Sequence, residues 1–334
     1  MVLFSTKKRL FICLPGQAGG AAAAKLLTGE ISPSGKLTET WPLRLADVPS
    51  FGSFGKKYTW YGEGLCVGYR YYQKAKAAVR FPFGYGLSYT HFEYTDLRIE
   101  DCRVTATIAN IGSVPGAEVV QLYVAPPQDG PYRPLRELKG FEKVFLQPGE
   151  SKDVSFELND RSFAIWSDGW KIPGGVYGVE LGASCADIRL RGELAVEGES
   201  VPAPAWQKGS WYEKLRGRPL AQDFEKLFGG PILPEPAIKK GCFTMEMSTM
   251  EMKDRSPVMK AMFKATEKTI AQGFGGKADY SDPTFKMMVM SGADAPLRAA
   301  VLSSSGAFPA NVAEGLLATA NGHPLVGLKK LGGK

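Results

Sequence analysis

The stretch that most constrains this fold is residues 80–90, which read RFPFGYGLSYT. Aromatic side chains, two glycines and one proline fill it, and Arg80 is its only charged residue. Two glycines in so short a run disfavour a helix, because glycine loses more conformational freedom on ordering than any other residue. The aromatic side chains are equally unsuited to a loop surrounded by water. The stretch therefore predicts a rigid, buried crossover between two domains.

Length and composition are typical of a soluble globular protein. The chain has 334 residues, enough for two or three domains, with 44% hydrophobic and 22% charged residues. It contains no run of about 18 apolar residues, so no membrane span is predicted. The apolar run at residues 11–14 is too short for a signal peptide and is interpreted as a buried strand or a ragged start. We therefore expect a cytoplasmic chain with no membrane partner.

Cysteine and charge patterns argue against several kinds of site. The five cysteines are widely scattered and form no C-x-x-C pair, which argues against a disulfide framework or a zinc site. We expect reduced, mostly buried thiols. The net charge is +7, but the basic residues are spread evenly and only residues 7–9 form a basic triplet. No nucleic-acid partner is predicted, because such a site needs basic residues gathered on one face.

The first segment, residues 1–95, mixes glycine-rich turns with aromatic residues. A turn at 15–20 precedes an alanine-rich helix over 21–27, which we expect to end near Gly29. A strand, a turn and a helix in this order are a piece of an α/β layer. The segment is therefore interpreted as the truncated end of an α/β sandwich domain.

The second segment, residues 96–198, has the period of β-strands. Hydrophobic and polar residues alternate at 104–108, 154–158 and 187–196. Proline and glycine turn signals separate these runs. The pattern predicts an immunoglobulin-like or fibronectin III-like antiparallel β-sandwich.

The rest of the chain is predicted to be a linker followed by helices. Residues 199–210 are rich in proline and form the linker, and residues 211–334 form a mostly α-helical C-terminal region. Ser256 and Pro257 have the types preferred at the start of a helix, which we expect to reach Gln272. The predicted fold class is thus mixed: a partial α/β layer, a β-sandwich and a helical tail.

Three motifs together resemble signatures of glycoside hydrolase family 3. They are LPGQAGG at residues 14–20, YGEGLCVGYRYY at 61–72 and FPFGYGLSYT at 81–90. In that family such segments close the α/β sandwich domain and lead into a fibronectin type III-like domain. GAEVVQLYV at 116–124 and RELKGF at 136–141 resemble that second domain. The resemblance covers residues 11–196, and the helical tail is weakly similar to the appendage of some bacterial β-glucosidases.

The resemblance implies exo-acting hydrolysis of a β-linked glucoside or oligosaccharide with retention of configuration. This chemistry needs two carboxylates, a nucleophile and an acid/base. In the family the nucleophile stands on a TIM barrel, which needs roughly 250 residues. The acid/base lies upstream of the segment that matches residues 14–17. The sequence has no βαβ array of that length and no acidic residue before Leu14, so we assign no catalytic residue.

Three residues are candidates for substrate binding. Glu63 stands between two glycines in an aromatic-rich turn, and its commoner role would be a structural carboxylate bonded to backbone amides or to Arg70. Trp166 and Trp170 flank a turn that contains Asp168. They are suited to stacking on a sugar ring, although such tryptophans more often fill a sandwich core or cover its edge.

The sequence shows no signature of a metal or cofactor site. His91 and His323 fall in a strand entry and a turn, so neither belongs to a visible triad or metal pair. Nine of the ten methionines fall between Met245 and Met290, and their helical spacing favours core packing over a soft-metal site. No phosphate-binding loop is present. We expect no metal and no cofactor.

Two hypotheses for function follow. The first is a C-terminal accessory fragment of a β-glucosidase, inactive alone because both catalytic carboxylates are missing. The second is a non-catalytic carbohydrate-binding or scaffold module that pairs in trans with a chain bearing the barrel. The apolar N-terminal segment, which includes Phe11 and Leu14, favours a truncated piece with an exposed patch. A barrel further downstream is disfavoured, because residues from Trp211 onward lack a strand–helix repeat. Whether the chain by itself is an enzyme stays open.

Overall fold

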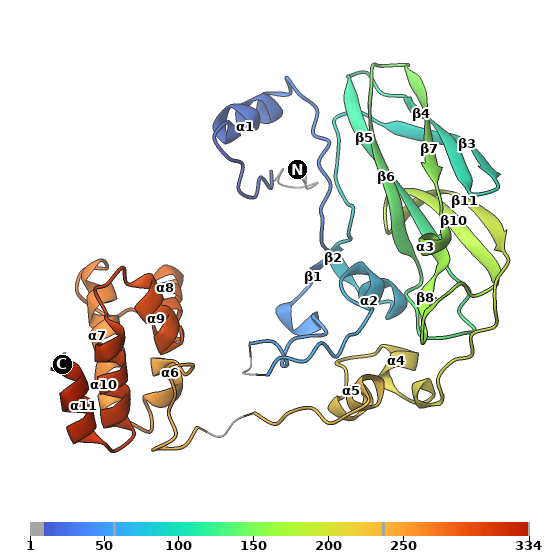
Figure 1. Ribbon diagram of the computed structural model, residues 1–334. Coiled ribbons are helices and arrows are strands. Elements are labelled where there is room, and N and C mark those ends of the chain that lie inside the picture. Colours follow the sequence, from blue (N-terminus) through green and yellow to red (C-terminus); the bar gives the residue numbers. More distant parts are fainter. Residues whose placement is uncertain (1–9, 56–57, 236–237, 333–334) are drawn as a thin grey trace. The chain divides into compact units, whose positions relative to one another are not determined.

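The computed structural model describes residues 10–55, 58–235 and 238–332 (Figure 1). The chain separates into two compact units, Met1–Pro234 and Glu235–Lys334. The first unit contains the sheets, and the second consists of helices. No helix in the described residues is long and apolar enough to cross a membrane.

Residues 92–196 form a β-sandwich of two sheets (Figure 1). One sheet has the order β3-β4-β7, and its strands are Phe92–Glu100, Arg103–Asn110 and Ser151–Glu157. The other has the order β11-β10-β5-β6, and its strands are Asp187–Val196, Gly175–Ser184, Gly116–Ala125 and Glu137–Leu146. All neighbouring strands of both sheets are antiparallel. The predicted fibronectin III-like sandwich and the mixed fold class are confirmed.

The core of the sandwich follows the alternation in the sequence. In β7, Val154 and Phe156 are buried and the residues between and beside them are exposed. The central strand β5 is buried on both faces over most of its length. A strand with a nearly continuous apolar run is suited to that position, because neither of its faces meets water.

The described chain that precedes the sandwich has few regular elements. Helix α1 (Gly19–Thr28) ends at Gly29, whose φ of 81° lies in the left-handed region that glycine adopts without strain. A short antiparallel pair joins β1 (Trp41–Pro42) to β2 (Val79–Phe81). The 3₁₀ turn η1 (Leu45–Asp47) and helix α2 (Tyr69–Lys74) lie between these strands in sequence.

Residues 11–14 form no buried strand. The interpretation of this apolar run as a buried strand is therefore wrong, and the alternative of a ragged start remains. Phe11, Ile12 and Leu14 are exposed, Leu14 by 97%. A strand needs a neighbour that pairs with its N–H and C=O groups. Among the described residues no strand pairs with this run, and its one recorded aromatic contact is the edge of Phe11 on Trp41.

The crossover at residues 80–90 is held in place by backbone hydrogen bonds. Leu37 N–H donates to the Tyr85 carbonyl over 2.8 Å, and Gly84 N–H donates to the Leu37 carbonyl over 2.8 Å. Gly84 has a φ of 79°, and a Cβ there would collide with the side chain of Gln121 on β5. Most side chains of the crossover are half-buried rather than fully buried, because the segment runs along the edge of the sandwich and not through its core.

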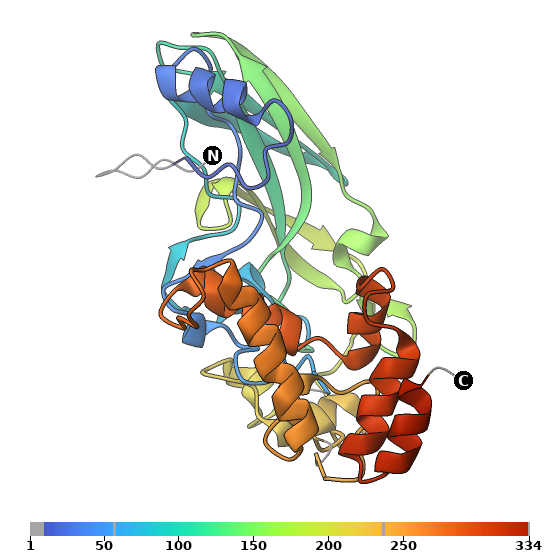
Figure 2. The same cartoon turned by 90° about the vertical axis from the view of Figure 1, so that its left-hand side faces the viewer.

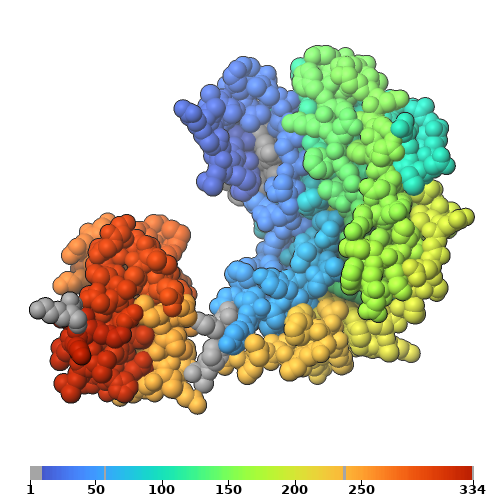
Figure 3. All heavy atoms as spheres, in the orientation of Figure 1, coloured from blue at the N-terminus to red at the C-terminus, as the bar shows by residue number. Residues whose placement is uncertain are grey.

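The residues that follow the sandwich fold back onto the first unit (Figure 3). They form η2 (Ala205–Gln207), α4 (Trp211–Lys214) and α5 (Ala221–Phe228). Trp211 and Tyr212 pack with Tyr71 and Tyr132 in one buried aromatic cluster. The two helices therefore belong to the first unit, although the sequence groups them with the helical region 211–334.

The second unit is a small set of helices. They are α6 (Thr249–Met252), α7 (Pro257–Gln272), α8 (Pro283–Ala293), α9 (Leu297–Ser303), α10 (Ala310–Ala320) and α11 (Pro324–Leu331). Helices α10 and α11 pack side by side (Figure 2). The Ser256 side chain accepts a hydrogen bond from Met259 N–H, so α7 begins and ends where the sequence predicts.

The cysteines differ from expectation in one respect. All five are free thiols, but only Cys66 and Cys185 are buried. Cys13, Cys102 and Cys242 are exposed, so the expectation of mostly buried thiols is wrong. Cys102 lies in the turn between β3 and β4, where no second layer covers the chain.

Candidate functional site

Glu63 lies in a tight turn beneath two tyrosines. The Tyr132 hydroxyl donates to the Glu63 carbonyl over 2.8 Å, and the Tyr212 hydroxyl donates to the Gly62 carbonyl over 2.7 Å. The Glu63 side chain is only 6% exposed, and its Oε2 has no hydrogen-bond partner among the residues that the structure describes. Burial, with a smaller contribution from nearby carboxylates that include Glu63, raises the pKa of Tyr212. Tyr212 therefore remains a neutral donor beside this carboxylate.

Arg70, which the sequence offers as a partner for Glu63, pairs elsewhere. Its Nη2 lies 3.6 Å from Oε1 of Glu137 on β6. The guanidinium also lies over the ring of Tyr69. Glu63 is thus a buried residue whose turn is held through its backbone, and among the described residues its side chain is recorded in no ion pair.

Trp166 and Trp170 lie together on a two-stranded hairpin. The hairpin pairs β8 (Ile165–Trp166) with β9 (Trp170–Lys171). The two ring centroids are 5.6 Å apart with planes at 80°, and the side chains are 67% and 55% exposed. They do not fill the core of the sandwich. Such exposed indole faces are suited to stacking on a sugar ring.

Local contacts hold this hairpin in shape. The guanidinium of Arg161, from α3 (Asp160–Phe163), lies 3.6 Å from the ring centroid of Trp170. Asp168 has a φ of 53°, and Ser167 N–H donates to the Gly169 carbonyl over 2.8 Å. Asp168 is thus the turn aspartate that the sequence predicts. Arg161 covers one indole face, which leaves the remaining indole surface for a ligand.

The structure brings Trp166 and Trp170 together but places Glu63 in another neighbourhood. Glu63 packs beneath Tyr132 and Tyr212, and the two tryptophans lie on the hairpin with Arg161. These three residues therefore do not form one site.

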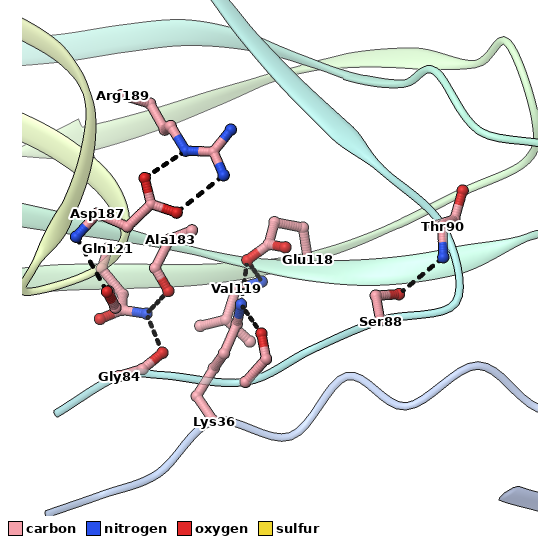
Figure 4. A network of polar contacts seen from close by, with 12 residues as sticks. Lys36, Gly84, Ser88, Thr90, Glu118, Val119, Gln121, Ala183, Asp187 and Arg189 are labelled. Carbon is pink, nitrogen blue, oxygen red and sulfur yellow. Dashed lines mark hydrogen bonds and ion pairs between the residues drawn. The ribbon is translucent and has the colours of Figure 1, made fainter. Parts of the chain in front are cut away.

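A polar cavity that sequence reasoning missed lies beside the crossover (Figure 4). Its volume is about 390 Å³. The residues that line it come from the loop before β1, the crossover, β3, β5 and the β10–β11 hairpin. Those with polar or charged side chains that bear on its chemistry are Lys36, His91, Tyr94, Glu118, Asp187 and Arg189.

Two ion pairs give the cavity its polar character. Lys36 Nζ lies 2.7 Å from Glu118 Oε1, and both side chains are almost fully buried. Arg189 binds Asp187 through two parallel hydrogen bonds of 2.6 and 2.8 Å (Figure 4). The bonds to Asp187 raise the pKa of the Arg189 guanidinium. A bidentate pair of this kind is rigid as well as strong.

A backbone group orients the Glu118 carboxylate, and the Ser184 hydroxyl holds the backbone at Asp187. Val119 N–H donates to Glu118 Oε1 over 3.0 Å, and Asp187 N–H donates to Ser184 Oγ over 3.0 Å. Asp187 and Arg189 stand two residues apart on β11, so both side chains point to the same face of the sheet. This D-x-R spacing in an alternating strand is the one signal by which the sequence could have indicated the cavity.

Tyr94 on β3 also lines this cavity. Burial, and then the nearby charge of Glu118, raises the pKa of its hydroxyl. The hydroxyl is therefore a neutral donor at ordinary pH. Among the described residues no three His, Cys, Asp or Glu side chains are grouped so as to hold a metal ion.

Two family models match this chain. Residues 6–89 match the glycosyl hydrolase family 3 C-terminal domain, and residues 118–185 match a fibronectin type III-like domain. The first of these ranges contains the crossover and Glu63, and the second contains Glu118 and the two tryptophans. The resemblance drawn from the motifs is confirmed.

Curated relatives are similar over somewhat more than half of this chain. An exo-alpha-(1->6)-L-arabinopyranosidase of Bifidobacterium breve is 44% identical over 211 residues, which are 59% of this chain and 28% of the relative. Thermostable beta-glucosidase B of Acetivibrio thermocellus is 43% identical over 196 residues, which are 55% of this chain and 26% of the relative. The chain thus spans little more than a quarter of the length of these relatives.

Solved structures agree with the sequence matches. The GH3 beta-glucosidase of Bifidobacterium adolescentis is 40% identical with a TM-score of 0.54, and the match covers 60% of this chain and 32% of that one. Beta-glucosidase 3B of Thermotoga neapolitana, solved with glucose, is 40% identical with a TM-score of 0.53, and the match covers 55% of this chain and 27% of that one.

Proposed function

We propose that this chain, which carries the glycosyl hydrolase family 3 C-terminal domain and a fibronectin type III-like domain, is the C-terminal accessory portion of a retaining, exo-acting β-glucosidase. The similarity to β-glucosidases over more than half of the chain supports this proposal. The substrate of the complete enzyme would be a β-linked glucoside or oligosaccharide. Because one relative is named for an arabinopyranoside, the sugar itself is the least supported part of the proposal.

The chain alone is proposed to be inactive. A retaining glycosidase needs a protonated acid and a nucleophilic carboxylate about 5–5.5 Å apart. The observation that carries the proposal is that both acids lining the polar cavity are paired with cations, Glu118 with Lys36 and Asp187 with Arg189. Each of these carboxylates is already bonded to a cation, so neither is free to attack a sugar. Glu63 does not line this cavity.

A second candidate is a scaffold module that pairs in trans with a catalytic chain. Leu14 and Leu27 are both exposed to solvent. Exposed apolar side chains fit either candidate, because in both of them another protein part would cover this surface. Both candidates predict that glucoside hydrolysis requires another protein part that supplies the catalytic barrel.

The chain is also proposed to act in the cytoplasm. Its five cysteines are free thiols, three of them exposed. Exposed free thiols are more stable in a reducing compartment than in an oxidising one.

Reconstitution tests the proposed function. Hydrolysis of an aryl β-glucoside would be measured for this chain alone, and again after mixing with beta-glucosidase 3B of Thermotoga neapolitana that lacks the region matched by this chain. We expect no turnover by either part and measurable turnover by the mixture. Glu63→Gln is the matched variant for the first measurement. Turnover by the chain alone that Glu63→Gln abolishes would overturn the proposal and make Glu63 a catalytic residue.

A further inference from the structure

We propose that the polar cavity beside the crossover binds a small neutral polyhydroxylated ligand, one glycosyl unit in size. The class of ligand follows from the lining of the cavity. The choice of a sugar among polyols rests on the function proposed above.

The size and walls of the cavity fit such a ligand. Its volume of about 390 Å³ lies within the range of about 300–1,000 Å³ that is usual for small-molecule pockets. Leu87, Phe92 and Ile111 line part of it and supply apolar surface. A pyranose ring presents C–H groups as well as hydroxyls, so it can contact an apolar wall and a polar wall at the same time.

The charges of the lining favour a neutral ligand. Lys36 and Glu118 neutralise each other over 2.7 Å, and Asp187 and Arg189 do so over 2.6 Å. A ligand of either charge would have to compete with one of these pairs. A hydroxyl can instead accept from Lys36 or Arg189 and donate to Glu118 or Asp187 without breaking either pair.

The lining is also held rigidly before any ligand binds. Lys36 Nζ donates to the Gly86 carbonyl of the crossover over 3.5 Å as well as pairing with Glu118. Ser184 Oγ accepts from Asp187 N–H and so fixes the end of the β10–β11 hairpin. A preorganised site loses little conformational freedom on binding.

Tyr94 is the second, independent observation that points to a ligand. Tyr94 is only 8% exposed, and its hydroxyl lies near Glu118 but makes no hydrogen bond of good geometry among the residues described. The tyrosine lines the cavity, and its ring lies beside Arg189, with the guanidinium carbon 5.8 Å from the ring centroid. A buried hydroxyl without a partner is unfavourable, so a ligand hydroxyl that accepts from Tyr94 would remove that cost.

Binding to the full chain tests the inference. Glucose and cellobiose would be titrated while backbone amide NMR shifts are followed. We expect saturable shifts confined to the lining of the cavity, at residues 36, 84–94, 111, 118 and 183–189. Glucose 6-phosphate should bind at least about tenfold more weakly than glucose, because its charge disrupts an ion pair. No saturable shift, shifts centred on Trp166 and Trp170, or tighter binding of the phosphate would each overturn the inference.

Matched variants separate the cavity from the hairpin. Tyr94→Phe keeps the ring and removes the hydroxyl, and we expect about a tenfold loss of affinity for glucose. Trp166→Ala alters the exposed hairpin and should leave that affinity unchanged. If Tyr94→Phe fails to fold, the shift map of the unaltered chain still decides the question. If this chain binds glucose but the reconstituted mixture shows no hydrolysis, the result would count against the proposed function and not against this inference.

Discussion

The β-sandwich and the helical second unit bury their side chains by different means. In the sandwich, aliphatic residues such as Val104, Ile108 and Leu122 are fully buried between two sheets. In the helical unit, Met252 and Met259 occupy the core. Long hydrogen-bonded ladders fix the positions of strands, whereas short helices are held by caps and by adaptable side chains. The polar cavity lies in the first unit, beside the sandwich.

For its size, the helical unit also leaves more large apolar side chains exposed to solvent than the β-sandwich of residues 92–196 does. Met287, Leu302 and Leu325 are exposed on three different helices. The expectation that the methionines pack in the core is therefore met only in part. A helix of two or three turns can bury one side against its neighbours, and the rest of its surface remains uncovered.

The largest difference between the units should appear in thiol reactivity. Burial raises the pKa of Cys185, at the β10–β11 turn, to about 12, whereas Cys242 of the helical unit is exposed. Because the thiolate is the reactive form, we expect Cys185 to react at least about a hundredfold more slowly with an aromatic disulfide. The folded pKa lies above the ordinary value of 9.0, so the stability that this thiol contributes is complete below that pH and is lost as the pH rises toward about 12.

Time-resolved labelling with mass spectrometry would measure both rates. Cys242→Ser is the control that removes the exposed thiol of the helical unit. Equal rates at the two cysteines in the native protein would refute the difference.

A core substitution should have the next largest effect. Leu122→Ala creates a cavity on β5, and we expect it to lower the free energy of unfolding by about 2–5 kcal/mol. In the helical core, Met252→Leu conserves volume and should cost less than about 1.5 kcal/mol. All six tryptophans precede residue 235, so tryptophan fluorescence during denaturation reports the first unit and far-UV circular dichroism reports the helices. The contrast would be contradicted if Leu122→Ala shifted the fluorescence transition no more than Met252→Leu shifts the circular dichroism transition.

A substitution in the crossover tests whether its close approach to β5 contributes to stability. Gly84→Ala introduces a Cβ that collides with Gln121 at a positive φ, and we expect a loss of about 1–3 kcal/mol. Gly149→Ala is the matched control, because Gly149 has a similar φ of 77° but open space around it. Denaturant midpoints of the two variants would be compared. Equal losses would show that backbone conformation alone, and not the close approach to β5, requires glycine at residue 84.

The N-cap of α7 should contribute less to stability than these packing contacts do. Ser256→Ala removes the acceptor for Met259 N–H, and we expect a cost of about 1 kcal/mol to the helical unit. Ser256→Asp keeps an acceptor oxygen and should restore most of that loss. Thermal unfolding followed by circular dichroism measures both, and an unchanged midpoint for Ser256→Ala would show that the unit does not depend on this cap.

The smallest effect is expected on the surface of the helical unit. Met287→Gln replaces an exposed side chain and should change stability by no more than about 0.5 kcal/mol. The same unfolding experiment measures this change. A loss of stability above roughly 1.5 kcal/mol, near the lower end for core substitutions, would mean that Met287 is covered in solution.

Much of the fold could be predicted from the sequence, because strands and capped helices leave local signals. The alternation at 154–158 and the Ser256–Pro257 cap both mark elements that the structure contains. The run at residues 11–14 could not be interpreted in this way, because a short apolar run does not show whether a partner strand lies beside it. The candidate site was predicted only in part, since Trp166 and Trp170 were named and the polar cavity was not.

The sequence by itself determined the order of the segments, the strand period, the helix caps and the family resemblance, because each depends on residues close together in the chain. Only the tertiary structure decided that Lys36 meets Glu118 and that Arg70 pairs with Glu137. These contacts join residues tens of positions apart. Their existence depends on how sheets and loops pack, and no local pattern records that packing.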